Sequence, residues 1–401
     1  MASNAVAALF RTRIVLWILA GSVVWENGCC GEFNSLYEAL TGRRLAGLPG
    51  VERLGLGLGG WASLGVTYNS RNPGDHMNGP VTFNDRASEP QLNQLYLYLE
   101  RVVNKEAKRW DVGGRLDVVW GTDSRFVHAA GNWDEDLIRE EDLRFYDLAF
   151  SQAYLEIATP WVRGATAKLG HFYTILGQEV VQSPNNFFYS HSYAMQYGEP
   201  FTHTGVLVSY PLRESISLLV GVVTAPYLGY DNFDRRLSNW NFLGGLTWVG
   251  DSGETSISAA LTSGPVSMPG DPNRTIASLV FNHAVTGELQ YILQMDHGSQ
   301  TRLGQEDANW YGVNQYLIYA LTDSVSLGLR GEWFRDDDGA RVTAAPASYY
   351  ELTTGLNWKP EGWLQLRLEG RNDWVDGARP AFGSSTRNRQ FTLGASATVL
   401  F

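Results

Sequence analysis

Disulfide bridges, long apolar runs and an excess of basic residues are all missing from this chain. It has 2 Cys among 401 residues, too few for a disulfide scaffold. Its longest apolar stretch, Ile14 to Trp25, is shorter than the ~20 residues that a membrane-spanning helix needs. Acidic residues outnumber basic ones by 42 to 31, whereas phosphate binding requires clustered Lys and Arg. A helical membrane protein is therefore excluded, and no nucleic-acid partner is expected.

The first 30 residues have the order of an export signal. Arg11 and Arg13 precede the apolar run, and polar and small residues follow it. A buried core helix is the alternative, but it gives no reason for the basic residues in front of the run. Cys29 and Cys30 come next, and adjacent cysteines rarely satisfy disulfide geometry with each other. Lipid modification, a cross-link to another chain and the absence of any role stay open for them, and we favour the last.

From residue 54 onward the hydrophobic pattern has a period of two, which is typical of β-strands. Along residues 363–371, leucines at every second position oppose a polar face made of Gln365, Arg367, Glu369 and Arg371. Sixteen such segments occur, near 56–68, 91–102, 110–120, 151–158, 164–171, 203–210, 215–223, 240–249, 254–262, 274–282, 286–295, 309–320, 324–334, 349–358, 363–371 and 389–400. The chain is therefore expected to be all-β.

The lengths of the connections separate a soluble sheet from a membrane barrel, because both kinds of sheet alternate in the same way. Short connections such as PLRE after Tyr210 alternate with long ones such as residues 172–202. This asymmetry indicates a transmembrane antiparallel up-and-down β-barrel over residues 54–401, with about 16 strands (range 14–18), short periplasmic turns and long extracellular loops. The barrel must close, because an open sheet edge would leave backbone groups unpaired in hydrocarbon.

Aromatic residues gather near the ends of the expected strands, where a membrane interface would place them. Each one alone would be read as filling a soluble core, but so many at strand ends favours interfacial girdles. The candidates are Tyr68, Trp110, Trp120, Trp240, Trp248, Trp310, Trp333, Trp358 and Trp363.

The ending QFTLGASATVLF resembles that of Gram-negative outer-membrane proteins, where a terminal aromatic after alternating apolar residues is associated with recognition by the barrel-assembly machinery. The matching positions here are Phe391, Leu393, Val399 and Phe401, with small alanines between them. The stretches GLGGWASLGVTYN, QLYLYLER and KLGHFYTILGQEVVQSPNNFFYSHSYA resemble the beta-barrel porin-2, OmpL-like family over nearly all of the chain after residue 50. That resemblance implies passive diffusion across the bacterial outer membrane.

A barrel of sixteen strands is wide enough to hold water, so its inward side chains decide what passes. The expected inward charges are of both signs, often two residues apart on one face. Opposite charges in that relation either neutralise each other or set a field across a narrow passage. These residues are Arg115, Asp117, Glu156, Lys168, Arg330, Glu332, Arg367, Glu369 and Arg371.

The third long loop, near residues 172–202, is the best candidate for a constriction because it is unusually apolar and aromatic for an exterior segment. By resemblance to general porins, we expect it to fold into the channel. Its titratable residues are Glu179, His191 and Glu199, and the two glutamates are expected to face the passage. The alternative is a cap packed on the rim or in a subunit interface.

No catalytic, cofactor or metal site is expected. The seven His show no metal-ligand spacing such as HExxH, and no GxSxG elbow occurs. The second long loop is acidic, and so is the run Asp336 to Asp338. Both are expected to be solvated; binding of divalent ions and a bias of entry toward cations are the alternatives.

Two classes of function remain after these exclusions. The favoured one is an outer-membrane diffusion channel for small hydrophilic solutes or ions, with outer-membrane lipid around it and a homotrimer as the expectation from general porins. The other is a barrel that anchors surface loops for partner binding or adhesion. Residues 31–53 are expected to form a short periplasmic segment with a helix over SLYEALTG, too small for an energy-coupled plug.

Overall fold

The computed structural model describes residues 34–106, 108–129, 145–162, 164–226, 239–266, 272–301 and 306–401. The predicted export signal, Cys29 and Cys30 lie outside these residues, as does most of the acidic part of the second loop. Two short helices, α2 (Leu36–Thr41) and α3 (Pro49–Arg53), and the 3-10 turn η2 (Leu45–Gly47) precede the barrel. None of the helices in the described ranges is long and apolar enough to cross a membrane.

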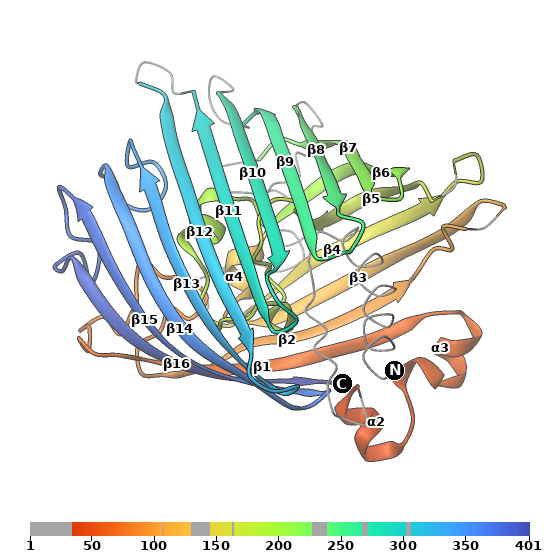
Figure 1. Cartoon of the computed structure of the whole chain (residues 1–401), viewed down its shortest axis with the longest axis horizontal. Coiled ribbons are helices and arrows are strands. Elements are labelled where there is room, and N and C mark those ends of the chain that lie inside the picture. Colours follow the sequence, from red (N-terminus) through yellow and green to blue (C-terminus); the bar gives the residue numbers. More distant parts are fainter. Residues whose placement is uncertain are drawn as a thin grey trace.

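Helix α2 forms where SLYEALTG predicts one, because both of its ends are capped. The Ser35 side chain accepts a hydrogen bond of 3.1 Å from the Glu38 backbone N–H, and Gly42 ends the helix with a left-handed φ of 66°. Helix α3 leads directly into the first strand (Figure 1). The periplasmic location of this segment stays a prediction.

The sixteen strands form one closed antiparallel barrel in which each strand pairs with its neighbours in sequence (Figure 1). The prediction of an all-β barrel of about 16 strands is confirmed. The strands are β1 (Gly57–Asn69), β2 (Pro90–Arg101), β3 (Asp111–Gly121), β4 (Asp147–Ala158), β5 (Thr166–Tyr173), β6 (Thr202–Arg213), β7 (Ile216–Thr224), β8 (Trp240–Val249), β9 (Thr255–Pro265), β10 (Asn273–Ala284), β11 (Leu289–Gln300), β12 (Ala308–Ala320), β13 (Val325–Asp336), β14 (Ala347–Glu361), β15 (Leu364–Gly377) and β16 (Arg389–Leu400).

Pairing of β1 with β16 closes the barrel. The register runs from Trp61 opposite Leu400 to Asn69 opposite Thr392. The terminal residue extends the seam, because Phe401 donates its N–H to the Gly60 carbonyl at 2.9 Å and accepts from the Gly60 N–H at 3.1 Å. Phe391 and Leu393 of the predicted assembly signal are exposed on the outer face, whereas Val399 and Phe401 are half-buried. Their recognition by an assembly machinery stays a prediction.

The alternation of side chains separates an apolar outer face from a polar inner face, as the pattern along β15 illustrates. Gln365, Arg367, Glu369 and Arg371 are buried on the inside, whereas Leu368 is 58% exposed on the outside. Because each strand keeps this alternation, one register fixes which residues face the interior.

The strand-end aromatics divide into two groups. Seven are exposed, as an interfacial role requires, although that role stays a prediction: Tyr68, Trp110, Trp120, Trp240, Trp248, Trp333 and Trp358. Trp363 lies half-buried in the turn between β14 and β15. The expectation for Trp310 is wrong, because its side chain is 0% exposed. It shares the inward face of β12 with Asn314 and Tyr316, so the register places it inside despite its position near a strand end.

Candidate functional site

The chain between β5 and β6 runs inside the barrel, and we call residues 174–201 the inner segment. It contains a 3-10 turn, η3 (Ser183–Asn185), and a short π-helix, η4 (Ala194–Gly198). Its side chains form apolar clusters with the inner wall, in which Leu176, Tyr193 and Ala194 pack with Trp310 and Phe334. Burial of these apolar side chains explains why so aromatic a connection does not remain in water.

Arg330 of β13 is a fully buried anchor of the inner segment. Its Nε lies 2.5 Å from Glu351 Oε1 of β14, and its Nη1 lies 2.6 Å from Glu179 Oε1 of the segment. The same Nη1 donates to the Ser190 carbonyl at 2.8 Å. A buried guanidinium must have its charge and its donors matched, and here one wall carboxylate and one segment carboxylate do so together.

Two arginines of β15 hold other parts of the inner segment by its backbone carbonyls. Arg367 donates to the carbonyls of Ser183 at 3.0 Å and Phe188 at 3.1 Å, and Arg371 donates to the His191 carbonyl at 2.6 Å. Arg371 is balanced on the wall by Asp373, whose Oδ1 lies 2.8 Å from its Nη2. These contacts bind the segment by its main chain.

Two wall carboxylates bind the segment in the opposite sense, by accepting from its backbone N–H groups. Glu332 of β13 accepts from Tyr193 at 2.6 Å and from Ala194 at 2.7 Å. Glu369 of β15 accepts from Tyr189 at 2.8 Å and from Ser190 at 3.0 Å. The five charged residues of β13 and β15 that were predicted to line an open passage are thus used as anchors.

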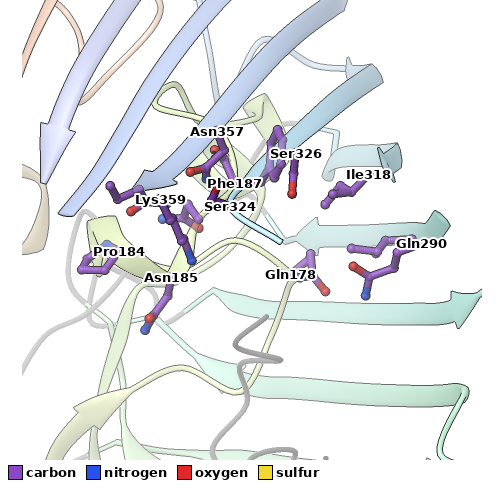
Figure 2. Close-up of a pocket in the computed structure, with 13 residues that line it drawn as sticks. Gln178, Pro184, Asn185, Phe187, Gln290, Ile318, Ser324, Ser326, Asn357 and Lys359 are labelled. Atoms are coloured by element: carbon purple, nitrogen blue, oxygen red, sulfur yellow. Dashed lines mark hydrogen bonds between the residues drawn. The ribbon is translucent and has the colours of Figure 1, made fainter. Parts of the chain in front are cut away.

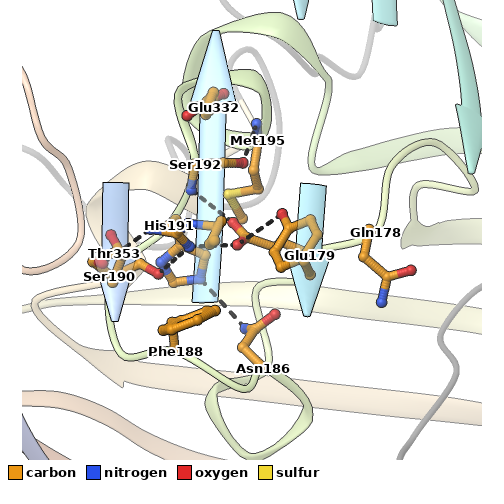
Figure 3. A network of polar contacts seen from close by, with 12 residues as sticks. Gln178, Glu179, Asn186, Phe188, Ser190, His191, Ser192, Met195, Glu332 and Thr353 are labelled. Atoms are coloured by element: carbon orange, nitrogen blue, oxygen red, sulfur yellow. Dashed lines mark hydrogen bonds and ion pairs between the residues drawn. The ribbon is translucent and has the colours of Figure 1, made fainter. Parts of the chain in front are cut away.

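Glu179, His191 and Glu199 are all buried, so the expectation that the two glutamates face the passage is wrong. Figure 3 shows Glu179 and His191 within a network of polar contacts. Glu179 accepts from the Ser192 N–H at 2.7 Å and from the Tyr316 hydroxyl at 3.1 Å, in addition to its ion pair with Arg330. Burial opposes its charge, but Arg330 outweighs that effect and lowers the pKa of Glu179. The wall and the segment thus stabilise the charged Glu179 carboxylate by hydrogen bonds and an ion pair, in place of the water of a passage.

The other two titratable residues of the segment are stabilised in their neutral forms. Burial lowers the pKa of His191 to about 4. Glu199 accepts from the Gln294 amide, which also donates to Asp296 at 2.6 Å. Burial beside the Asp296 carboxylate raises the pKa of Glu199 well above its usual 4.5. None of these three side chains therefore supplies a charge exposed in a channel.

A second cluster of charged residues lies on β2 to β5, and part of its surface is accessible to solvent. Arg115 Nη1 lies 2.9 Å from Glu100 Oε2, and Arg115 Nε lies 2.7 Å from Asp117 Oδ1. The Arg115 guanidinium carbon lies 4.5 Å from the centre of the Tyr98 ring. Glu156 and Lys168 face each other across β4 and β5, and both are half-buried. Of the predicted inward charges, Arg115, Glu156 and Lys168 are the ones that keep accessible surface.

A cavity lies between the inner segment and the wall of β11 to β15, at the end of the barrel where the turns are short (Figure 2). The wall contributes Gln290, Asn357 and Gln365, and the segment contributes Asn185 and Phe187. The sequence places Gln365 on the polar face of its strand, but it marks none of these neutral residues as part of a site. Their inward position follows from the strand alternation, but no motif marks the partners that the segment brings to them.

Within the described ranges, no group of three or more His, Cys, Asp or Glu is placed to hold a metal ion. His171, His203 and His191 lie near the inner segment but bind different partners. His171 contacts the Thr204 hydroxyl at 2.9 Å, and His203 contacts the Thr174 hydroxyl at 3.0 Å. The charged clusters of the interior are ion pairs and backbone anchors, an arrangement suited to holding a segment in a barrel.

The fold is similar to those of solved outer-membrane channels. The channel DcaP of Acinetobacter baumannii aligns with a TM-score of 0.58 and 13% identity, covering 86% of this chain and 97% of that one. An anion-selective porin from Comamonas acidovorans gives 0.60 and 9%, covering 86% and 99%. OprB of Pseudomonas putida gives 0.59 and 11%, covering 88% and 96%. At these identities the likeness shows the fold alone.

No curated protein matches the sequence. Residues 55–401 match the family described as "Putative beta-barrel porin-2, OmpL-like", which is the family that the motifs of the sequence suggested. The match covers the whole barrel. The chain belongs to this family and is a porin of the bacterial outer membrane.

Proposed function

We propose that the barrel is a passive diffusion channel for small hydrophilic solutes or ions, and that the inner segment narrows it. The observation that carries this proposal is the anchoring of residues 174–201 to the inner wall by Arg330, Glu332, Arg367, Glu369 and Arg371. A segment held by so many buried charges keeps one position, and its volume is removed from the water-filled interior. Solutes then pass beside it, where Arg115, Glu156 and Lys168 remain accessible.

Single-channel conductance tests the narrowing directly. Deletion of residues 180–195 should raise the conductance and change the ion selectivity, because it removes the most tightly anchored part of the inner segment. The double variant Glu332→Gln with Glu369→Gln should shift both quantities in the same direction while the segment is kept, because a neutral amide accepts more weakly from the backbone. Glu254→Gln, in the exposed turn between β8 and β9, is the matched control.

Unchanged conductance and selectivity in both variants, with the barrel correctly folded, would reject the narrowing. Liposome swelling with sugars of graded size tests the channel itself. Uptake that falls as the solute grows is the expected result. Folded protein without size-dependent uptake would favour the alternative, in which the barrel anchors surface loops for partner binding or adhesion.

We also infer a homotrimer. One of the similar structures, OmpT of Vibrio cholerae, is described as a trimer form, and the alignment covers 86% of this chain and 99% of that one at 11% identity. The outer face carries apolar side chains, such as Leu64 and Leu368, that either lipid or a neighbouring barrel can cover. Light scattering of the detergent-solubilised protein should give the mass of three chains, and the mass of one chain would contradict this inference.

Transport without catalysis is the last part of the proposal. The family and the fold are those of a channel, and the interior charges bind the inner segment. We infer that the chain is not an enzyme. Purified barrel protein should cleave neither peptide nor ester substrates, and turnover that is lost on mutation of an inward residue would overturn this.

A further inference from the structure

The cavity beneath the inner segment differs from the rest of the interior in its chemistry. Six of the residues that line it are amides: Gln178, Asn185, Asn186, Gln290, Asn357 and Gln365. Lys359 is the only charged residue among the described lining residues, and none of them is a carboxylate. Other inward residues of β13 to β15 form ion pairs, so the neutral lining of the cavity differs from the rest of the same wall.

Three of these amides have an unused acceptor. Gln290 Oε1, Asn357 Oδ1 and Gln365 Oε1 lack a hydrogen-bond partner in the described part of the chain. Each side chain is more than nine-tenths buried. A buried polar atom without a partner costs free energy, and this cost is removed when a ligand or water supplies the missing donor.

The amides can adapt to a ligand by a small movement. The last torsion of Asn and Gln is soft and roughly two-fold, so rotation exchanges the positions of the amide oxygen and nitrogen. Gln365 can then present either an acceptor or a donor to the cavity, whereas Gln290 and Asn357 present acceptors, because their nitrogens already donate to the Asn282 side chain and to the Phe187 carbonyl. A hydroxyl group matches both states because it is itself a donor and an acceptor.

An apolar surface lies among these polar groups. Phe187 is half-buried, with its ring against Gly328 of β13, where an added Cβ would come within 2.2 Å of the ring. The absence of a side chain at Gly328 lets the ring lie close to the wall. The C–H face of a sugar ring can pack on such an aromatic side chain while its hydroxyls reach the amides. Figure 2 shows Phe187 among the labelled amides and serines.

We propose that this cavity is a binding site for an uncharged polyhydroxylated solute, such as a sugar or a polyol, and that a solute bound there reduces the current through the water-filled part of the barrel beside it. The inference rests on the proposed channel function and names a class of solute that the channel binds. An anionic solute would find one lysine and no arginine among the described lining residues, and a cationic one would find no carboxylate. Neutral hydroxyl groups are the chemistry that the amides and serines recognise best.

Block of the ion current in a planar bilayer tests this site. Glucose should reduce the current reversibly. Gluconate, the open-chain acid of the same sugar, should do so only at a much higher concentration, because it carries a carboxylate and has no ring face to pack on Phe187. The double variant Asn357→Leu with Gln365→Met keeps similar volume without the amides. Its half-blocking glucose concentration should rise by roughly tenfold, the effect expected for one or two lost hydrogen bonds.

Asn314 gives a matched control. It is also inward-facing and buried, and both atoms of its amide lack a partner in the described ranges, but it does not line the cavity. Asn314→Leu should leave the block unchanged. If the double variant fails to fold, Gln290→Met provides the same test with one amide, and the glucose and gluconate comparison needs no variant.

The outcomes separate the site from the channel. A channel that conducts ions but is not blocked by glucose, or is blocked equally by gluconate, would overturn the inference while the proposed function stands. Equal half-blocking concentrations in the wild type and the folded amide variants would also overturn it. A folded barrel that conducts no ions would overturn the proposed function and this inference with it.

Discussion

The walls on the two sides of this barrel use the same kind of sequence pattern differently. On β13 and β15, the inward charges Arg330, Glu332 and Arg371 are buried against the inner segment. On β2 to β5, the inward charges Arg115 and Lys168 mostly meet other wall residues and keep some accessible surface. Alternation places both sets inside, but the partner that arrives from another part of the chain decides whether a charge is an anchor or lines the passage.

The largest expected effect is the loss of an anchor on the β13 side. Arg330→Met should destabilise the barrel by about 3–5 kcal/mol, because it leaves Glu179 and Glu351 buried without their shared cation. Arg115→Met on the other wall should cost about 1–2 kcal/mol, since Asp117 keeps hydrogen bonds from Tyr96 and Gln152. Reversible unfolding in urea with lipid present measures both. Equal losses would remove the distinction between the two walls.

A second prediction concerns the start of the inner segment itself. Gly177 has a φ of +81°, and a Cβ there would lie 1.9 Å from Glu199 Oε2. Gly177→Ala should therefore cost about 2–3 kcal/mol, from backbone strain and from crowding of a buried carboxyl group. Gly253→Ala is the matched control, with a φ of +76° and nothing within 4 Å of the added Cβ. It should cost about 1 kcal/mol.

The difference between these two glycine variants isolates the crowding. If urea unfolding gives the same loss for both, the contact between Gly177 and Glu199 contributes nothing beyond backbone strain. In that case the inner segment depends on its wall anchors alone, and the contrast between the walls becomes sharper.

A third prediction uses pH to compare two buried carboxyl groups. Asp123, just after β3, receives hydrogen bonds from the Asn93 and Gln94 amides, and burial raises its pKa to about 7. The stability that it contributes is present below pH 3.8 and is lost as the pH rises through about 7. Glu179 has the opposite sign, because Arg330 lowers its pKa: its contribution is present above pH 4.5 and is lost as the pH falls.

Asp123→Asn should therefore flatten the pH dependence of stability between about pH 4 and about pH 7, removing a slope of at most about 1.4 kcal/mol per pH unit. The midpoint of urea unfolding across that range measures it. Asp75→Asn is the control, since Asp75 is exposed and its pKa is lowered. A slope that persists unchanged in Asp123→Asn would show that the pKa of Asp123 is not raised in the folded protein.

Much of the fold follows from the sequence because strand alternation is a local signal. It gives the strand count, the inward face of β15 and the closure by the last strand. Trp310 and Trp333 show that the position of a residue along a strand must be combined with the face of the strand on which it lies. Both lie near strand ends, but Trp310 lies on the same buried face of its strand as Asn314, whereas Trp333 is exposed. Position along a strand alone does not separate the lumen from the membrane interface.

The site is less predictable, because its contacts join residues far apart in sequence. Glu179 was singled out for its charge, but its partner Arg330 lies 151 positions away. Tyr193 donates to Asp373 at 2.8 Å across 180 positions. The alternation along β15 predicts that Asp373 faces inward. Nothing in the sequence, however, predicts which wall residue each part of the inner segment will contact. Charge and strand alternation therefore predict which residues face inward, but they do not predict which of these residues contact each other.

The smallest effect on stability is expected for a variant whose main consequence is selectivity. Arg115→Gln removes one positive charge from the accessible wall and leaves Glu100 and Glu156 beside the passage, while Asp117 is buried. The stability should change by about 1 kcal/mol or less. Because a passage is selective by the charges along it, the reversal potential under a salt gradient should move toward cation preference.

The control for selectivity is Arg335→Gln on β13, which removes the same charge from a residue that faces away from the lumen and pairs with Asp337 at 2.5 Å. It should leave the reversal potential unchanged. If Arg115→Gln also leaves it unchanged, ions do not pass along β2 to β5, and the open route lies elsewhere in the barrel. A shift in Arg115→Gln alone would place the conducting path on the wall whose charges the inner segment has not occupied, because only charges that meet water act on a passing ion.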